Sequence, residues 1–118
     1  MIKRSFLWRD LICFQFDVYR NPSERTRDYQ PYFMIIQHDY YDNLSTRLII
    51  PLSYQNYLRD HVNAAAPLIN IDFQRYYLNT AGITHVEKKK LHNKNFVCNL
   101  RCARSTVIAA IDALVTNT

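Results

Sequence analysis

Four histidines are the residues of this chain that could move a proton near neutral pH: His38, His61, His85 and His92. General acid–base cleavage of a phosphodiester needs two such groups on one phosphate, and His38 beside Asp39 is the only tempting pair. The apolar run before them predicts a strand, and neighbours on a strand point to opposite faces. The sequence therefore disfavours a catalytic pair, and the four histidines are expected at the surface or, for His61, at the edge of the core.

Three cysteines could bind metal or form disulfides: Cys13, Cys98 and Cys102. An odd number without a secretion signal is typical of reduced thiols in the cytosol, so we expect a cytoplasmic protein. Cys98 and Cys102 would lie one turn apart only if a helix covered both. Together with His92 their spacing matches no zinc pattern. We therefore predict no metal and no cofactor.

Length and composition indicate one folded, soluble domain. The chain has 118 residues, of which 48% are hydrophobic and 14% aromatic, enough for a core without disulfides. No apolar run approaches the roughly 18 residues of a membrane span. The net charge of +5 admits an acidic partner, either a nucleic acid or an acidic peptide.

Short apolar runs predict a mostly antiparallel β architecture. Phe14, Phe16 and Val18 alternate with polar residues, which is typical of a strand with one face on the core. A continuous run from Tyr32 predicts a strand covered on both faces. Pro51 should end the third strand because it has no N–H to donate. The predicted strands span residues 14–19, 32–36, 47–50, 68–71 and 75–79, with a further hairpin over 85–98 that has three lysines at its tip.

Two helices and two polar loops complete this prediction. Ser53 can cap a short helix that runs to about Val62. The last segment is the clearest helix, and its apolar stripe comprises Leu100, Ala103, Val107, Ile111 and Leu114. Residues 21–30 and 39–45 are polar and are predicted as loops. The expected fold is therefore mostly β with a C-terminal α-helix.

In this order, the segments resemble the CcdB family of bacterial toxins. The stretch from Phe14 to Arg20 resembles the family's opening strand, and residues 35–39 resemble its second strand and exit. Arg-Leu-Ile-Ile-Pro-Leu at 47–52 resembles its most recognisable signature, and Pro-Leu-Ile-Asn-Ile at 67–71 fits a later segment. The similarity covers residues 14–118 as a single toxin domain and leaves residues 1–13 as an N-terminal extension without a counterpart.

The resemblance implies a fold, an activity and partners. The fold would be the SH3-like antiparallel β-barrel shared with the MazF and Kid toxins, assembled as a homodimer partly through the C-terminal helices. The protein would be the toxin of a type II toxin–antitoxin module, bound by a CcdA-like antitoxin and contacting operator DNA only together with it. It would inhibit DNA gyrase by binding between the arms of the gyrase A subunit, without making or breaking a bond. A MazF-like endoribonuclease on the same fold is the alternative.

The family also implies a target-facing surface. Gyrase poisons of this family end in Trp-Gly-Ile, where this chain has Thr-Asn-Thr. Loss of such an aromatic anchor typically costs more than ~2 kcal/mol of binding free energy, so the chain is expected to be either a gyrase inhibitor or a degenerate homologue of one. The residues that face the target by resemblance are Tyr40, Tyr41, Asp42, Arg104, Ser105, Ile108, Asp112, Thr116, Asn117 and Thr118.

A second surface is expected to meet the antitoxin. The 21–30 loop corresponds to the place where family toxins contact antitoxin. Arg20, Arg25 and Arg27 lie in or beside it. Guanidinium groups suit an acidic, disordered antitoxin tail that folds on binding.

Overall fold

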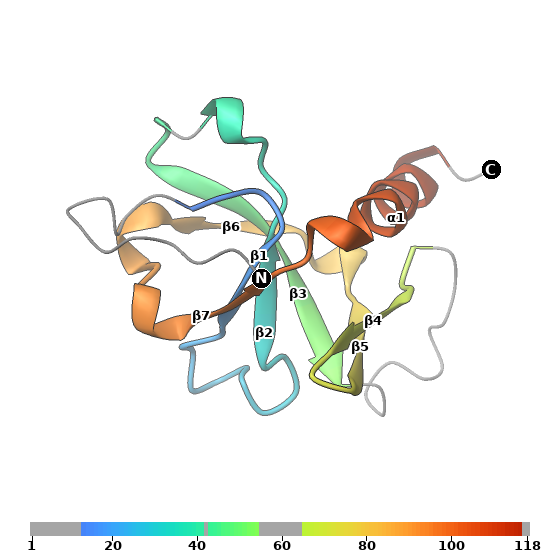
Figure 1. The fold of residues 1–118 in the computed structure, drawn as a ribbon, viewed down its shortest axis with the longest axis horizontal. Helices are drawn as coiled ribbons and strands as arrows, with labels where there is room; N and C mark the ends of the chain where they lie inside the picture. Colours follow the sequence, from blue (N-terminus) through green and yellow to red (C-terminus); the bar gives the residue numbers. More distant parts are fainter. Residues whose placement is uncertain (1–12, 42, 55–64, 117–118) are drawn as a thin grey trace.

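The structure, a computed structural model, describes residues 13–41, 43–54 and 65–116. Within these ranges the chain forms antiparallel strands and a C-terminal helix (Figure 1). The strands and helix are β1 (Asp17–Arg20), β2 (Tyr32–Ile35), β3 (Thr46–Tyr54), β4 (Leu68–Ile71), β5 (Gln74–Leu78), β6 (Thr84–Glu87), β7 (Phe96–Asn99) and α1 (Arg104–Thr116). Short 3-10 turns connect them: η2 (Asp39–Tyr41), η5 (Thr80–Gly82), η6 (Lys88–Lys90), η7 (Asn93–Asn95) and η8 (Arg101–Ala103). None of the described helices is long and apolar enough to cross a membrane.

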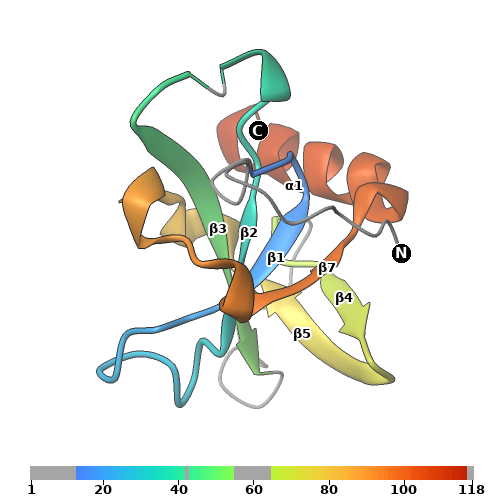
Figure 2. The same cartoon turned by 60° about the vertical axis from the view of Figure 1, so that its left-hand side comes forward.

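The strands form one sheet in the order β4-β5-β3-β2-β1-β7, with β6 also paired to β3. The sheet curls into a half-barrel, and α1 lies across its concave side (Figures 1 and 2). The nine-residue strand β3 pairs with β2 along one edge, whereas its other edge is divided between β6 and β5. This arrangement confirms the expected antiparallel β fold with a C-terminal helix.

Pro51 does not end its strand, contrary to the sequence prediction. It pairs with Phe33 in the middle of β3, between the segment that contacts β6 and the segment that contacts β5. The Pro51 carbonyl accepts a hydrogen bond of 2.9 Å from the N–H of Asn79. The N and O of one strand residue point to the same side, so the N–H that proline lacks would also face Asn79. The Asn79 carbonyl accepts instead from the Gly82 N–H at 2.9 Å, so Pro51 leaves this carbonyl with a donor.

The first strand is shorter than its alternating pattern predicted. Phe16 has a φ of 72°, so the extended backbone begins only at Asp17. Phe14 consequently leaves the predicted apolar face and is 36% exposed. The buried Asp17 carboxylate accepts hydrogen bonds from the Phe14 N–H and the Asn99 side chain at 2.8 and 2.9 Å. These bonds hold the turn before β1 against β7.

Two other predictions were wrong. Ser53 lies buried within β3 and starts no helix; the remainder of the predicted short helix falls in residues 55–64, outside the described residues. Strands β6 and β7 do not form a hairpin, because β6 pairs with β3 and β7 pairs with β1. The lysine run forms the turn η6 between them.

The core lies on both faces of the sheet, which explains why the central strands are apolar throughout. Val18, Met34 and Ile50 face a cluster that also contains Val107 and Ala110 of α1. Their neighbours along the strands face a second cluster, which comprises Cys13, Tyr19, Phe33, Ile35, Ile49 and Leu91. The prediction that residues 32–36 are covered on both faces is therefore confirmed.

Candidate functional site

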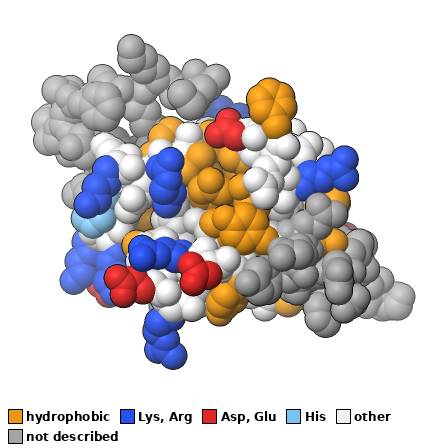
Figure 3. All heavy atoms as spheres, turned by 90° about the horizontal axis from the view of Figure 1, so that it is seen from below, with side chains coloured by type: hydrophobic (Ala, Val, Ile, Leu, Met, Phe, Trp, Pro, Cys, Tyr) orange, Lys and Arg blue, Asp and Glu red, His pale blue; other side chains and the backbone are white. Residues whose placement is uncertain are grey.

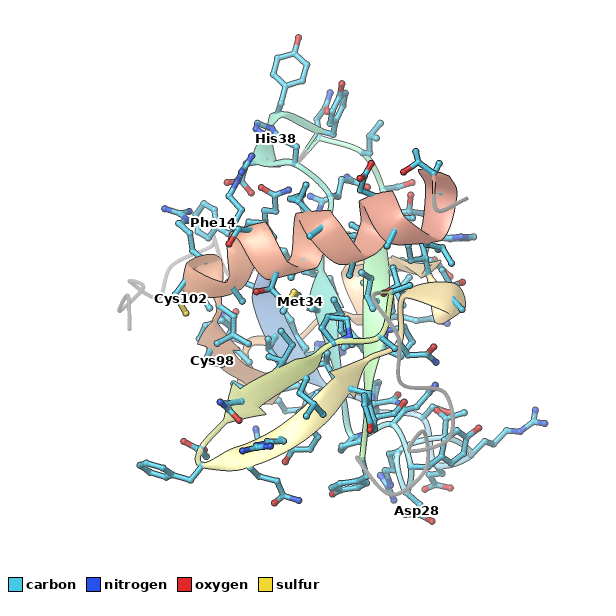
Figure 4. The ribbon with its side chains drawn as sticks, turned by 90° about the vertical axis from the view of Figure 1, so that its right-hand side faces the viewer. Phe14, Asp28, Met34, His38, Cys98 and Cys102 are labelled. Atoms are coloured by element: carbon cyan, nitrogen blue, oxygen red, sulfur yellow. The ribbon has the colours of Figure 1, made fainter. Side chains whose placement is uncertain are left out.

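The first candidate site is the tyrosine loop, residues 39–45. The Tyr40 side chain is 78% exposed and that of Tyr41 is 50% exposed, and their rings meet edge to face with centroids 5.0 Å apart. Leu44 adds exposed apolar surface beside them. In Figure 4 the loop that follows His38 projects beyond α1 into solvent. Asp42, predicted to belong to this surface, lies outside the described residues.

Gln37 ties the two ends of the tyrosine loop together. Its side-chain Nε2 donates to the Tyr41 carbonyl at 3.0 Å and to the Thr46 carbonyl at 3.3 Å. Its Oε1 accepts from the Leu48 N–H at 3.2 Å. One amide therefore connects the segment that enters the loop with the strand that leaves it.

Arg47 fixes the tyrosine loop from a buried position near the start of β3. Its side chain is almost completely buried, and Nη1 donates to the carbonyls of Leu44 and Thr46 at 2.6 and 2.9 Å. The sequence interpretation missed this role. The sequence did contain a signal for it. Arg47 lies two positions before Ile49, and the period of two of a strand places both side chains on the same buried face.

His38 and Asp39 also act on the backbone of this region. His38 Nδ1 accepts from the Tyr40 N–H at 2.9 Å, and Asp39 Oδ1 accepts from the Gln15 N–H at 2.7 Å. Both residues follow the end of β2, so the argument from opposite strand faces does not apply to them. Each uses a side-chain atom to fix the backbone of the loop or of the segment beside it.

The outer edge of α1 forms the second part of the predicted target-facing surface. The side chains of Arg104, Ser105, Ile108 and Asp112 are exposed along α1, and Thr116 lies at its end. Thr116 Oγ1 donates to the Asp112 carbonyl at 2.7 Å. Helix α1 itself packs on the core cluster of the sheet through Val107 and Ala110. Asn117 and Thr118 lie outside the described residues.

The end of α1 exposes apolar side chains. Leu114, which belongs to the predicted apolar stripe, is 43% exposed, and Val115 is 73% exposed. Val107 and Ala110 are the buried residues of α1, so the covered part of the stripe ends before its last turn. Ile108, at 42% exposure, adds a further apolar side chain to the free side of α1, beside the exposed Arg104 and Asp112.

A basic hollow of about 580 Å³ forms the third candidate site. Arg20 at the end of β1, Arg27 in the 21–30 loop and Lys94 in η7 line it, which brings two of the three predicted antitoxin contacts together. Arg25 is exposed but does not line the hollow. Figure 3, viewed from the side of this loop, shows basic and acidic side chains beside a band of hydrophobic ones. Sequence reasoning missed Lys94, which comes from a distant turn.

Asn21 gives the 21–30 loop its shape. Its Nδ2 donates to Thr26 Oγ1 and to the Gln30 carbonyl, both at 2.8 Å, and its Oδ1 accepts from the Ser23 N–H at 3.0 Å. The loop prediction is confirmed. One side chain therefore connects the start, middle and end of the loop. Because this loop forms one wall of the basic hollow, that wall is held in place by hydrogen bonds within the loop.

Among the described residues, no three His, Cys, Asp or Glu side chains come close enough to hold an ion. Burial raises the pKa of the Cys98 thiol, and the carboxylates of Asp72 and Asp17 raise it further. Asp72 lies at the tip of the β4–β5 hairpin.

The fold and these exposed surfaces define a small β half-barrel domain whose candidate sites are surfaces and shallow hollows. A family model described as CcdB protein matches residues 15–117, and the chain therefore belongs to the CcdB family. It is accordingly a toxin of the toxin–antitoxin type, with an antitoxin as its general partner. No curated protein matches the chain significantly.

Proposed function

We propose that this toxin acts by binding, with the DNA gyrase A subunit as its target and an acidic CcdA-like antitoxin as its neutralising partner. In this proposal the protein is a homodimer, catalyses no reaction, and contacts operator DNA only together with the antitoxin. The family match supports the toxin–antitoxin class. The assignment of surfaces rests on the geometry of the tyrosine loop and the basic hollow.

The tyrosine loop is the observation that carries the target half of the proposal. Exposed tyrosines on a backbone that is already fixed contribute apolar contact area at a low entropic cost of binding. Tyr40 and Tyr41 meet this description, because Gln37 and Arg47 hold the loop from both ends. These rings would supply the anchor that the chain end, Thr-Asn-Thr, lacks.

The basic hollow supports the antitoxin half. Arg20, Arg27 and Lys94 surround it, and Asp28 is the single carboxylate among its lining residues. Guanidinium and ammonium groups around one hollow favour the carboxylates of an acidic peptide. An antitoxin tail bound there would contact three separate segments of the toxin.

Toxicity in paired strains tests the target. Expression should arrest growth in gyrase-sensitive cells and spare cells whose gyrase resists this class of poison. Arrest in both strains with RNA decay would instead indicate an endoribonuclease. A second candidate function, favoured by the missing Trp-Gly-Ile tip, is a homologue that binds antitoxin only. That candidate predicts no arrest in either strain together with intact antitoxin binding.

Matched variants test the surface. A Tyr40→Ser, Tyr41→Ser double variant should lose capture of purified DNA gyrase, because both exposed rings are removed. Tyr29→Ser is the control, since Tyr29 is also exposed, at 38%, but belongs to the other loop. Equal loss in both variants, or no loss in the double variant, would contradict a contact through the tyrosine loop.

A further inference from the structure

An apolar pocket adjoins the basic hollow and differs from it in chemistry. It has a volume of about 330 Å³ and lies on the face of the sheet opposite α1. Its floor consists of core residues of that face, namely Phe33, Ile49 and Leu91. Because these side chains belong to a packed core, the pocket is part of the fold itself, and it has room for one large apolar side chain.

The walls of the apolar pocket are also fixed. On one side stands the 21–30 loop, from which Asn21, Thr26 and Gln30 line the pocket. These three residues are joined to one another by hydrogen bonds of the Asn21 side chain. On the other side stand Thr84 and Val86 of β6. A ligand therefore meets a hollow that is already formed, and little free energy is lost in ordering it.

The apolar pocket and the basic hollow share a boundary. Both are lined by Asn21, Pro22 and Tyr32, which belong to the start of the 21–30 loop and the start of β2. Figure 2 shows the loop that follows β1 on the same side of the sheet as η6 and η7. Turn η6 contributes Lys90 to the pocket, and η7 contributes Lys94 to the hollow. One bound segment can therefore contact both hollows.

The charges that select a ligand lie in the basic hollow and not in the pocket. Lys90 lines the pocket, but its ammonium group pairs with Glu87 at 3.8 Å. Within the described part of the chain, by contrast, no salt bridge involves the cations of the hollow, Arg20, Arg27 and Lys94. A ligand that suits both hollows has a large apolar side chain next to carboxylates. A second copy of this chain, with its net charge of +5, lacks that character.

We propose that the apolar pocket and the basic hollow form one composite site for the antitoxin. An apolar side chain of the antitoxin fills the pocket, and carboxylates beside it contact the hollow. This inference rests on the proposed antitoxin partner and adds the chemistry of its binding segment, an acidic stretch that contains a large apolar residue. The carboxylates attract the segment to the toxin, whereas the apolar residue makes a contact that salt does not screen. The toxin thereby distinguishes its antitoxin from other acidic peptides.

Binding of the purified CcdA-like antitoxin to four toxin proteins, followed by calorimetry, tests the composite site. Compared with the wild type, Thr84→Trp fills the apolar pocket from an exposed position of β6 and should weaken binding about tenfold or more, in low salt and in 0.5 M salt alike. His85→Trp is the matched control, because it adds the same ring at the next exposed position of β6, which does not line the pocket. It should bind as the wild type does. Arg27→Glu reports on the hollow, and its loss should shrink in 0.5 M salt.

The outcomes separate this inference from the proposed partner. If Arg27→Glu weakens binding but Thr84→Trp binds as His85→Trp does, the antitoxin uses the hollow without the pocket, and the composite site is overturned. If Thr84→Trp weakens binding but Arg27→Glu does not, the two hollows do not act together, which also overturns it. A wild-type toxin that binds no antitoxin would overturn both the inference and the proposed partner.

A double-mutant cycle identifies the side chain that enters the pocket. Each large apolar residue of the antitoxin is replaced in turn by alanine. Replacement of the inserted residue should weaken binding to the wild-type toxin and have little further effect on binding to Thr84→Trp, which has already lost that contact. Equal losses with both toxins for every replacement would contradict a contact in the pocket. Should Thr84→Trp lose its native circular dichroism, Ser23→Trp blocks the pocket from the loop side and serves in the same comparisons.

Discussion

Arg47 is the residue on which the conformation of the tyrosine loop depends most directly. Its replacement by Met should remove two hydrogen bonds to loop and strand carbonyls. We expect the free energy of unfolding to fall by about 1–3 kcal/mol, the usual range for buried bonds to a charged group. Hydrogen exchange should speed up at Leu44, whose N–H bonds the Tyr41 carbonyl within the loop.

The control for this change is Arg104→Met, since Arg104 is exposed on α1. That variant should leave both stability and loop exchange unchanged. If amide hydrogens in the loop of the Arg47→Met variant exchange at the wild-type rate, Gln37 and Asp39 hold the loop without the Arg47 side chain.

The arginines of the 21–30 loop should differ in their effect on antitoxin binding. Arg27→Glu places a carboxylate in the basic hollow, whereas Arg25→Glu makes the same charge change on a side chain that does not line it. Binding of an acidic antitoxin peptide, followed by calorimetry, should weaken at least tenfold more for Arg27→Glu than for Arg25→Glu. The difference should shrink in 0.5 M salt, because exposed charges are screened.

Equal losses from the two reversals would mean that general charge, and not the hollow, attracts the antitoxin. A double variant that adds Lys94→Glu should weaken binding further than Arg27→Glu alone. The structure makes this prediction possible because it places Lys94 beside Arg27.

The two C-terminal cysteines should react with alkylating agents in a fixed order. Burial raises the pKa of Cys98, so at pH 8 a smaller fraction of it is the reactive thiolate, whereas Cys102 is exposed. Peptide mass spectrometry after a short iodoacetamide pulse should find Cys102 modified first. Cys98 should follow as the pH rises toward its raised pKa or when the protein is denatured. Faster labelling of Cys98 in the native protein would contradict its burial against β1.

At the scale of elements, α1 has more apolar surface than the half-barrel covers. Leu114 and Val115 are exposed in its last turns, whereas Val107 and Ala110 complete the core. We expect this end of α1 to lie in the homodimer interface, because burial of exposed apolar surface drives association. Leu114→Lys with Val115→Lys should halve the mass measured by light scattering at micromolar concentration.

Ser105→Lys is the matched control, because it adds a charge to the exposed first half of the same helix. That variant should keep the dimeric mass. A wild-type protein that is already monomeric at micromolar concentration would refute the interface outright.

Strand pairing shows where sequence reasoning succeeds and where it fails. The period of two and the continuous apolar runs depend on local burial, so the class of fold and the positions of β2, β4 and β5 could be predicted. Pairing partners depend on the whole sheet. One edge of β3 pairs with β6 at its start and with β5 at its end. Pro51 is tolerated because it lies where the partner changes, and β6 lies apart from β7 because β6 pairs with β3.

The candidate site shows the same division. Arg20 and Arg27 are recognisable because they lie in or next to one polar loop, and Tyr40 and Tyr41 because they are adjacent. Lys94 could not be assigned, since the pairing of β1 with β7 is what brings its turn to the hollow. Arg47 could not be assigned a function either, because its bonds depend on how the loop backbone folds over it.

At the scale of the whole molecule, the half-barrel depends on a pairing between the beginning and the end of the domain. Strand β1 pairs with β7, and Asp17 is joined to Asn99 through their side chains. Helix α1, which completes the inner core, follows β7 in the chain. During synthesis β1 must therefore wait for about 80 further residues, which takes roughly 4–16 s at about 5–20 residues per second. The nascent chain can therefore complete this half-barrel only after β7 and α1 have left the ribosome, and until then β1 lacks its partner on that edge.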